Sequence, residues 1–417
     1  MKKNVWLLNH YANLPGRGLS LRHFNFAKEL VQRGYNVYIF ASSAAHNFDF
    51  NAIEDGASHK EEIVRDVHFV YIRTCSYVGN NLKRLKNILE YTFRLAKIAK
   101  IYAKVNMPDV IIGTSMHPLT LFAGRRIAKK LNSEYIIEIR DLWPETIKNY
   151  NPKFNRFLMG IFRSIEKYIY KRAKNIIITV EGGKDYILDM GWQKEIPLEK
   201  IAYINNGIDL KAFIENKELY TTKDEDLSDK TIFSVVYTGA IRKTNAIGIL
   251  VETAALLKER EINDVKLLIW GGGDELDYWK NQANGLGLDN IVFKGAVQKE
   301  YIPGIVSAAD LNILHQINAN MDGVYKYGSS QNKKFDYLAA GKPILCTVKT
   351  NYDVIVQGKC GITLDIQSPE TIVDGILYFR NMSSEEYNGY GERAFKTAEA
   401  FDFVKLTDRL EAVIESD

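Results

Sequence analysis

A lysine and a carboxylate stand one helical turn apart in the segment Ser330–Pro343, SQNKKFDYLAAGKP. The segment predicts a loop, a helix from Asn332, and a Gly-Lys-Pro exit into an apolar strand. A helix N-terminus carries free N–H groups and a positive dipole, so it can hold a pyrophosphate. Lys333 in the first turn opposes that dipole unless an anion binds there, and Asp336 can accept hydrogen bonds from ribose hydroxyls. The alternative is a solvated Lys–Asp pair.

Two further loops of the second half carry residues suited to phosphates. Gly239 follows an apolar strand and precedes the adjacent cations Arg242 and Lys243, which open a helix. Two cations there can neutralise the diphosphate that departs as a glycosidic bond breaks. Gly271–Gly273 follow another apolar strand and let the backbone approach a ligand closely. The alternatives are ordinary surface charge and a common glycine-rich turn.

In the first half, two polar loops follow apolar strands. Asp141 comes two residues after the run Tyr135–Ile139, and His117 comes shortly after Asp109–Gly113. Ligands bind at the carboxyl ends of parallel strands, so Asp141 and His117 are candidate catalytic residues, His117 as an acid or base. A structural, hydrogen-bonded histidine is the alternative.

The triplet Asp224-Glu225-Asp226 has the DxD form with which some transferases bind a metal ion. It lies in the charged stretch 215–230, so we interpret it as solvated charge and predict no metal site. The cysteines, Cys75, Cys346 and Cys360, form no CxxC pair. A disulfide scaffold or zinc knuckle is therefore not predicted, and a reducing cytosol fits.

These loops need two sheets to position them. A chain of 417 residues exceeds the usual size of one core, and apolar runs alternate with helical segments in both halves. The polar stretch 215–230 separates the two series and predicts a linker. We therefore predict an α/β fold of two Rossmann-like domains, residues 1–214 and 231–399, with parallel sheets facing across a cleft. A final helix at 400–417 is expected to pack back onto the first domain.

The charge of the chain is divided unevenly. Residues 1–210 carry 32 Lys and Arg against 20 Asp and Glu, whereas residues 211–417 carry 23 against 31. Two segments of the first half, 82–105 and 154–169, have the apolar spacing of amphipathic helices, which pack in a core or lie in a lipid headgroup layer. No apolar run is long enough for a signal peptide or a membrane span. We predict a cytoplasmic protein, peripheral on the inner, anionic face of the cell membrane; two merely solvated surfaces are the alternative.

The ordered motifs resemble a known family. They are similar to the family 4 glycosyltransferases of the GT-B fold, near the WbuB-like enzymes of bacterial O-antigen and capsule synthesis. The segments that carry the resemblance are LNHYANLPGRG (8–18), RHFNFAKELVQRGYNVYIFASS (22–43), PDVIIGTSMHP (108–118), EIRDLWPETI (138–147), INNGIDL (204–210), GGGDE (271–275), NIVFKGAV (290–297), NKKFDYLAAGKP (332–343) and CGITLD (360–365).

The resemblance implies a retaining, metal-independent transfer of a hexosyl or N-acetylaminosugar group from a nucleoside-diphosphate donor, UDP foremost. The acceptor would be an oligosaccharide or a polyprenyl-pyrophosphate-linked sugar held by the first domain. Lys333 falls on the lysine of the family's NKLFDY run, and Asp336 on the second residue of its paired-glutamate motif. The first glutamate falls at Gly328, and a lysine of many relatives falls at Asn245. The candidate catalytic residues are Asp141, His117, Arg242 and Lys333, and the candidate donor-binding residues are Gly16, Gly18, Gly239, Arg242, Lys243, Gly271, Gly272, Gly273, Val297, Gly328, Asn332, Lys333 and Asp336.

Two other functions fit the same architecture. A non-hydrolysing UDP-sugar epimerase shares the two-domain fold and needs no acceptor. A nucleotide-sugar-binding scaffold would keep the donor site without turnover. Nucleic-acid binding is not predicted, because no reading motif accompanies the basic residues and the second half is acidic.

Overall fold

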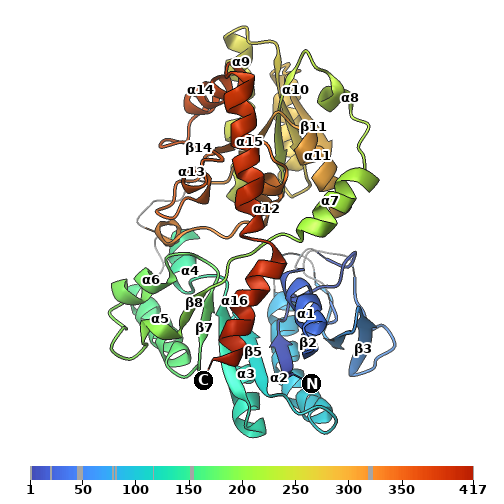
Figure 1. Ribbon diagram of the computed structural model, residues 1–417, viewed down its shortest axis with the longest axis vertical. Coiled ribbons are helices and arrows are strands. Elements are labelled where there is room, and N and C mark those ends of the chain that lie inside the picture. Colours follow the sequence, from blue (N-terminus) through green and yellow to red (C-terminus); the bar gives the residue numbers. More distant parts are fainter. Residues whose placement is uncertain are drawn as a thin grey trace. The chain divides into compact units, whose positions relative to one another are not determined.

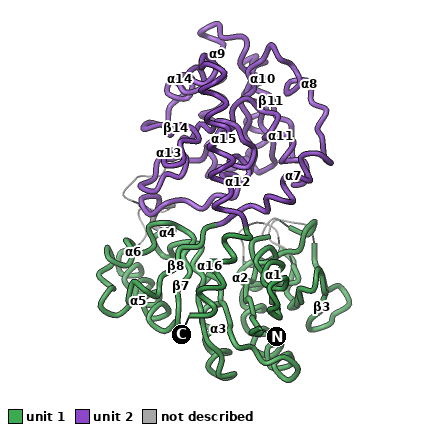
Figure 2. The backbone as a smooth tube through the Cα atoms, viewed as in Figure 1, with its two compact units in different colours: residues 1–205, 403–417 green, residues 206–402 purple. Residues whose placement is uncertain are grey.

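The computed structural model describes residues 2–18, 21–44, 50–77, 79, 82–115, 117–150, 155–317 and 323–416. The chain forms two compact units: unit 1 comprises residues 1–205 and 403–417, and unit 2 comprises residues 206–402 (Figure 2). Each unit is a mainly parallel sheet against which helices pack (Figure 1). The chain therefore passes between the units twice, at 205–206 and at 402–403.

Unit 1 is built on an eight-stranded sheet in the order β3-β4-β2-β1-β5-β6-β7-β8. Its central strands are apolar runs buried on both faces, as expected for a parallel sheet covered by helices. Among the described strand pairs of this sheet, β3 with β4 alone is antiparallel, and the residues of β3 at the edge are all exposed or half-buried. The strands are β1 Asn4–Leu8, β2 Asn36–Ser42, β3 His59–Val64, β4 Val67–Ile72, β5 Val110–Thr114, β6 Glu134–Ile139, β7 Ile176–Ile178 and β8 Ile201–Tyr203, and the helices are α1 Arg22–Gln32, α2 Leu82–Tyr102, α3 Pro118–Leu131, α4 Glu145–Tyr150, α5 Arg156–Tyr170, α6 Gly183–Asp189 and α16 Phe403–Glu415.

Unit 2 is built on a six-stranded, wholly parallel sheet in the order β11-β10-β9-β12-β13-β14. Its strands are β9 Phe233–Thr238, β10 Val265–Trp270, β11 Ile291–Gly295, β12 Leu311–Leu314, β13 Ile344–Cys346 and β14 Gly361–Thr363, and its helices are α7 Leu210–Leu219, α8 Glu225–Ser228, α9 Ile247–Glu259, α10 Leu276–Gly285, α11 Ile302–Ala308, α12 Asn332–Ala339, α13 Val354–Gln357, α14 Pro369–Arg380 and α15 Ser384–Glu399. The strand order reverses at β9, between β10 and β12, which is where an open α/β sheet binds ligands.

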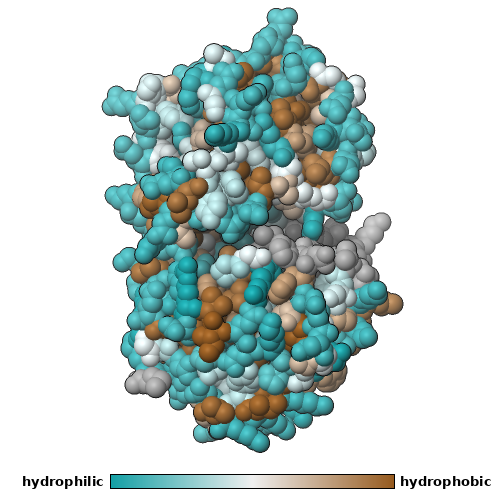
Figure 3. Space-filling model, turned by 90° about the vertical axis from the view of Figure 1, so that its right-hand side faces the viewer, coloured by the Kyte–Doolittle hydropathy of each residue, from teal (hydrophilic) through white to brown (hydrophobic). Residues whose placement is uncertain are grey.

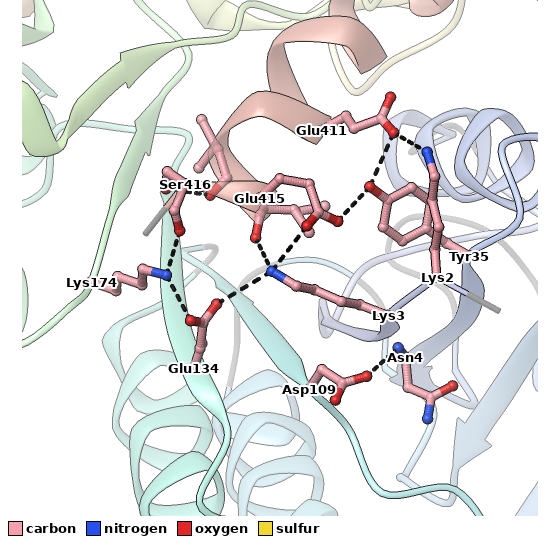
Figure 4. Close-up of polar contacts among 12 residues, drawn as sticks. Lys2, Lys3, Asn4, Tyr35, Asp109, Glu134, Lys174, Glu411, Glu415 and Ser416 are labelled. Carbon is pink, nitrogen blue, oxygen red and sulfur yellow. Dashed lines mark hydrogen bonds and ion pairs between the residues drawn. The ribbon is translucent and has the colours of Figure 1, made fainter.

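Helix α16 belongs to unit 1, although it follows the whole of unit 2 in the sequence. It packs against α1, with the rings of Phe26 and Phe403 edge to face at 5.1 Å. A polar network holds its last turns to the start of the chain (Figure 4). Lys3 Nζ donates to the Ile414 carbonyl at 2.8 Å, and the Tyr35 hydroxyl lies 2.7 Å from Glu415 Oε1.

The predicted linker at 215–230 is wrong in part. Helices α7 and α8 occupy most of it, and residues 206–214, predicted in the first domain, belong to unit 2 because α7 packs against α11. Asp224 and Asp226 are not solvated: both pair with Lys294, at 2.7 and 2.6 Å, and Asp226 also pairs with Lys266. This charge cluster ties the segment to β10 and β11.

Candidate active site

Lys333 reaches the carboxyl edge of the unit 2 sheet. It lies in the first turn of α12, and its Nζ donates to the Tyr237 hydroxyl at 3.0 Å and to the His315 carbonyl at 3.1 Å. Among the described residues no carboxylate pairs with it, and burial lowers the pKa of its amine to about 7. A half-buried cation without a counter-ion is suited to an anionic ligand.

The loops after β9 and β10 are in direct backbone contact, which leaves no room for a side chain at Gly271 and Gly273 of the second loop. A Cβ on Gly271, whose φ is +150°, would lie 1.7 Å from the Gly239 carbonyl oxygen, and one on Gly273 would lie 2.0 Å from that of Ile241. Gly239 borders Lys333: its own Cβ would lie 3.1 Å from Nζ. The predicted glycines and Lys333 therefore meet at one edge of the sheet.

The N-terminus of α12 has no side-chain cap. Gln331 occupies the N-cap position without bonding the helix, and its side-chain nitrogen and oxygen are both buried and unpartnered in the described part of the chain. The first N–H groups of the helix are thus left for a ligand. Asp336 is 8% exposed, and burial raises its pKa. Because Asp336 is buried and Lys333 bonds elsewhere, the alternative of a solvated Lys–Asp pair is wrong.

Within the ranges that the structure describes, the other predicted donor-site residues form no hydrogen bond or ion pair with Lys333. Arg242 and Lys243 are exposed, and Arg242 Nε lies 3.9 Å from Asp274 Oδ1. Val297 is 38% exposed just after β11, and Asn332 is exposed at the start of α12. Gly328 is buried with φ of +108°, a backbone that disfavours the glutamate of relatives at this position.

Asn245 stands where many relatives have a lysine. Its Nδ2 donates to the Tyr237 hydroxyl and to the Ala240 carbonyl, both at 2.6 Å. It therefore fixes the hydroxyl on which the amine of Lys333 rests. Tyr237 was not predicted from the sequence, because a tyrosine inside the strand VVYT reads as core.

In unit 1, His117 is the N-cap residue of α3 and belongs to a buried relay. His10 Nδ1 lies 3.0 Å from His117 Nε2, and His10 Nε2 lies 2.6 Å from Asn87 Oδ1. The Asn87 amide is oriented by its Nδ2, which donates to the Cys75 carbonyl. For neutral rings, His10 then donates to Asn87 and accepts from His117 Nε2. Burial lowers the pKa of His117 to about 4, so its Nδ1, which has no partner among the described residues, is a lone-pair acceptor.

A buried charge cluster beside this relay was missed. Arg22 Nε and His23 Nε2 lie 2.8 and 2.7 Å from the two oxygens of Glu138, and all three residues are at most 5% exposed. Burial opposes the charge of Glu138, but Arg22 and His23 hold its pKa well below its usual range. Arg22 also donates to the Ile204 carbonyl at 2.8 Å, next to the crossing into unit 2. The cluster positions β6 and the loop that carries Asp141.

Asp141 is exposed and lines one cavity with His117, so these two candidates are brought together. Gly18 is shielded by the Asn13 side chain, which a Cβ would meet at 2.4 Å, whereas a Cβ on Gly16 would meet open space. Both glycines lie in unit 1, whereas the other predicted donor-binding residues lie in unit 2.

Two family models match the chain. Residues 17–212 match Glycosyltransferase Family 4, and residues 232–381 match Glycosyl transferases group 1. An uncharacterized glycosyltransferase of Methanocaldococcus jannaschii is 25% identical over 224 residues, 52% of this chain and 51% of that protein. The chain thus matches about half the length of this curated relative.

Solved structures share the fold over nearly the whole chain. Sucrose-phosphate synthase from Thermosynechococcus elongatus has a TM-score of 0.72 at 15% identity, covering 98% of each chain. Anabaena HepE in complex with UDP and glucose has a TM-score of 0.67 at 15% identity, covering 100% of each chain.

The two parallel α/β units therefore form the GT-B fold, the class of two-domain glycosyltransferases. Two glycosyltransferase family models thus match successive parts of the chain, and together they support a group like family 4.

Proposed function

We propose that the protein is a retaining glycosyltransferase that moves a hexosyl or N-acetylaminosugar group from a UDP-sugar to a lipid-linked or oligosaccharide acceptor. The observation that carries the donor assignment is the arrangement of Lys333. Its amine, the uncapped start of α12 and the glycine loops after β9 and β10 converge on one sheet edge. Donors of this kind stabilise the charge that develops on a departing diphosphate.

The nucleoside is assigned to the same unit. Asp336 supplies a buried carboxylate one turn from Lys333 for the ribose hydroxyls, and the backbone of Val297, a residue 38% exposed, would meet the base. HepE was solved with UDP and with UDP-glucose, which supports uridine as the base for this chain. The phosphates have Lys333, Arg242 and Lys243, so we propose that no metal ion is required.

The acceptor is assigned to unit 1. His117 and Asp141 line a common cavity there, and His117 Nδ1 offers a lone pair to the acceptor. A role in bacterial surface polysaccharide synthesis is part of the proposal and follows from the sequence resemblance.

We propose that the protein acts at an anionic membrane surface, and the exposed apolar and basic side chains of α2 support this. Leu82 and Phe93 are 84% and 71% exposed, and Leu82, Leu85, Leu89 and Phe93 line a concave surface with Lys86 and Lys97. On α5, Phe157 is 75% exposed, while Phe154 lies outside the described residues. Figure 3 shows apolar patches among hydrophilic surface in the lower half of the molecule, which is unit 1. Within the described residues no helix is long and apolar enough to cross a membrane.

The experiment is calorimetric titration of the full chain with UDP, GDP, ADP and uridine. Tight binding of UDP, weaker binding of uridine and loss of UDP binding in Lys333→Met are expected. Equal binding of uridine and UDP would contradict the phosphate site. Mass spectrometry with UDP-sugars and no acceptor then tests the epimerase alternative, since an epimerase changes the sugar without an acceptor.

A further inference from the structure

A cavity of about 190 Å³ lies inside unit 1. Side chains from the ends of β5 and β6 and from α3, α4 and α5 surround it. Most of its wall is apolar, including Leu121, Ile139, Trp143 and Ile169. A cavity of roughly 150 Å³ holds a benzene-sized ligand, so this one admits a small group and excludes a disaccharide.

Two polar atoms in this wall lack partners. His117 Nδ1 and Glu166 Oε1 are both buried and have no partner within hydrogen-bond geometry among the described residues, although the Tyr170 hydroxyl in the same wall interacts with the Glu166 carboxyl. Glu166 is 3% exposed and lies in the middle of α5. Buried polar groups in native proteins are nearly always paired, so two orphans around one cavity indicate a missing ligand.

Glu166 offers a donor to the cavity. The Tyr186 hydroxyl donates to Glu166 Oε2 at 2.7 Å, so a protonated Glu166 would carry its proton on Oε1. Burial raises the pKa of Glu166 to about 8, although the Tyr186 and Tyr170 hydroxyls favour the ionised form. The nearby charges of Glu145 and Arg163 oppose each other, since Arg163 Nε lies 2.6 Å from Glu145 Oε1.

His117 offers the complementary acceptor. Its Nε2 proton is used toward His10, so Nδ1 presents a lone pair. Besides the polar side chains of Ser115, Asp141, Thr146 and Tyr170 in its wall, the cavity therefore offers one unpaired donor and one unpaired acceptor beside apolar side chains. A secondary amide with a methyl group has the matching set: a carbonyl oxygen, an N–H and an apolar end.

We propose that this cavity binds the acetamido group of an N-acetylated amino sugar in the acceptor, with Glu166 donating to the amide oxygen and His117 Nδ1 accepting from the amide N–H. The inference rests on the proposed function, in which unit 1 holds the acceptor. The methyl group would lie against the apolar wall. A free ammonium could pair with the Asp141 carboxylate in this wall, so the comparison with glucosamine decides between the two; a hydroxyl would leave the methyl space unfilled.

The test compares binding of the methyl β-glycosides of N-acetylglucosamine, glucosamine and glucose to the full chain. Ligand-observed saturation-transfer NMR is expected to show the acetamido methyl as the most strongly saturated resonance. Affinity for the N-acetyl glycoside should exceed that for the other two by about tenfold, the effect of one or two hydrogen bonds. Equal or tighter binding of methyl glucosaminide or methyl glucoside overturns the inference.

Three variants separate recognition from folding. Glu166→Leu removes the donor and should abolish the preference for the N-acetyl glycoside, whereas Glu166→Gln keeps a donor and should retain it. Ile147→Phe fills part of the cavity while leaving both polar groups unsubstituted, and it should exclude the acetamido methyl. A Glu166→Leu protein that is folded by circular dichroism and keeps the full preference contradicts the assignment. If that variant does not fold, Ile147→Phe with unchanged binding contradicts it equally.

UDP titration of the same samples distinguishes this inference from the proposed function. A chain that binds UDP and shows no preference for the acetamido glycoside overturns the inference alone. A chain that prefers the acetamido glycoside and binds no UDP supports the inference and contradicts the donor assignment.

Discussion

The amine of Lys333 lies 3.0 Å from the hydroxyl oxygen of Tyr237 and 4.2 Å from the centroid of its ring. A half-buried cation thus rests on a neutral aromatic side chain in place of a carboxylate. The pair keeps the lysine at the sheet edge without neutralising it, and a diphosphate can supply the missing charge.

UDP affinity should fall as pH rises above 7. The pKa of Lys333 is lowered to about 7, so the free protein loses this charge above that pH, while bound phosphates favour the protonated amine. Affinity should weaken by up to about tenfold per pH unit between pH 7 and 9, where UDP itself is fully ionised because its second phosphate pKa is about 6.

Calorimetry in two buffers of different ionisation heat measures the coupled proton uptake. Lys333→Arg, which stays charged, should bind with little pH dependence. A wild-type affinity that is flat from pH 7 to 9 would contradict the role of this lysine. In the absence of ligand, the lowered pKa makes this residue's contribution to stability rise with pH from 7 toward 10.5, because the unfolded chain binds the extra proton there.

Asp336→Asn should weaken UDP binding by about 1.5–3 kcal/mol, the cost of losing a hydrogen bond to a charged group. The substitution keeps the volume of this buried side chain. Asp274→Asn, at a mostly exposed carboxylate beside Arg242, is the matched control and should change affinity little. Titration of the two variants with UDP and with UMP measures the change in affinity. Unchanged UDP affinity in Asp336→Asn would contradict the assignment of Asp336 to the ribose.

Gly271→Ala should destabilise unit 2 by at least about 2 kcal/mol and abolish UDP binding, because its Cβ would overlap the Gly239 carbonyl in a strained backbone. Gly272→Ala is the control: its Cβ would meet only the Ala296 Cβ, at 3.6 Å. Urea unfolding compares the two. A Gly271→Ala protein as stable as Gly272→Ala would show that the loops are less tightly packed than described.

Transfer activity should survive EDTA. Lys333 and the start of α12 provide the positive charge that a metal ion would otherwise bring to the diphosphate. The described residues include no group of three or more His, Cys, Asp or Glu side chains arranged to hold a metal. The measurement is turnover of UDP-sugar with chelator, then with added Mn²⁺ or Mg²⁺; activity that depends on the added ion contradicts the prediction.

Binding to anionic vesicles should require the exposed face of α2. Lys83, Arg84 and Lys86 are the first cations of this helix, but Arg84 Nε lies 3.2 Å from the Tyr11 hydroxyl. The Tyr11 ring stacks on His10 at 4.4 Å, so changing Arg84 would disturb the relay of His10 and His117. Lys86, Lys97 and Lys100 are exposed and make the better set. Their replacement by Glu should release the protein, since each cation near the surface is worth about 1 kcal/mol. Co-sedimentation with neutral and anionic vesicles at low and high salt measures this, and salt-insensitive binding to both would contradict it.

The sequence predicted the fold and the residues that local patterns can reveal. Lys333 stands at a helix start after a loop, and Gly271–Gly273 follow an apolar strand, so spacing alone brings them to one edge. The resemblance supplied the fold class, which the solved structures confirm. The polar character of 215–230 suggested a linker. The prediction was wrong in part because Asp224 and Asp226 pair with Lys294, about seventy positions away, and local sequence does not reveal such distant partners.

The residues that the sequence did not reveal act through distant partners. His10 and Asn87 matter because they fix the tautomer of His117, and Glu166 matters because α5 turns it toward a cavity. The local sequence around each residue is typical of an ordinary secondary-structure element. Glu166, for example, lies in the helical run IEKYIY, where a glutamate is expected to be exposed to solvent. Partners more than a helical turn away leave no periodic signal.

The membership of α16 in unit 1 has a consequence for synthesis of the protein. Residues 403–415 leave the ribosome after all of unit 2, yet they cover Leu30 and Ile39 of the unit 1 core and bind Lys3 and Tyr35 at its start. Unit 2 is therefore complete while unit 1 still lacks one wall of its core. A nascent chain released just before residue 403 would carry a finished C-terminal domain joined to an N-terminal domain with an open apolar face, the kind of product that chaperones and proteases select.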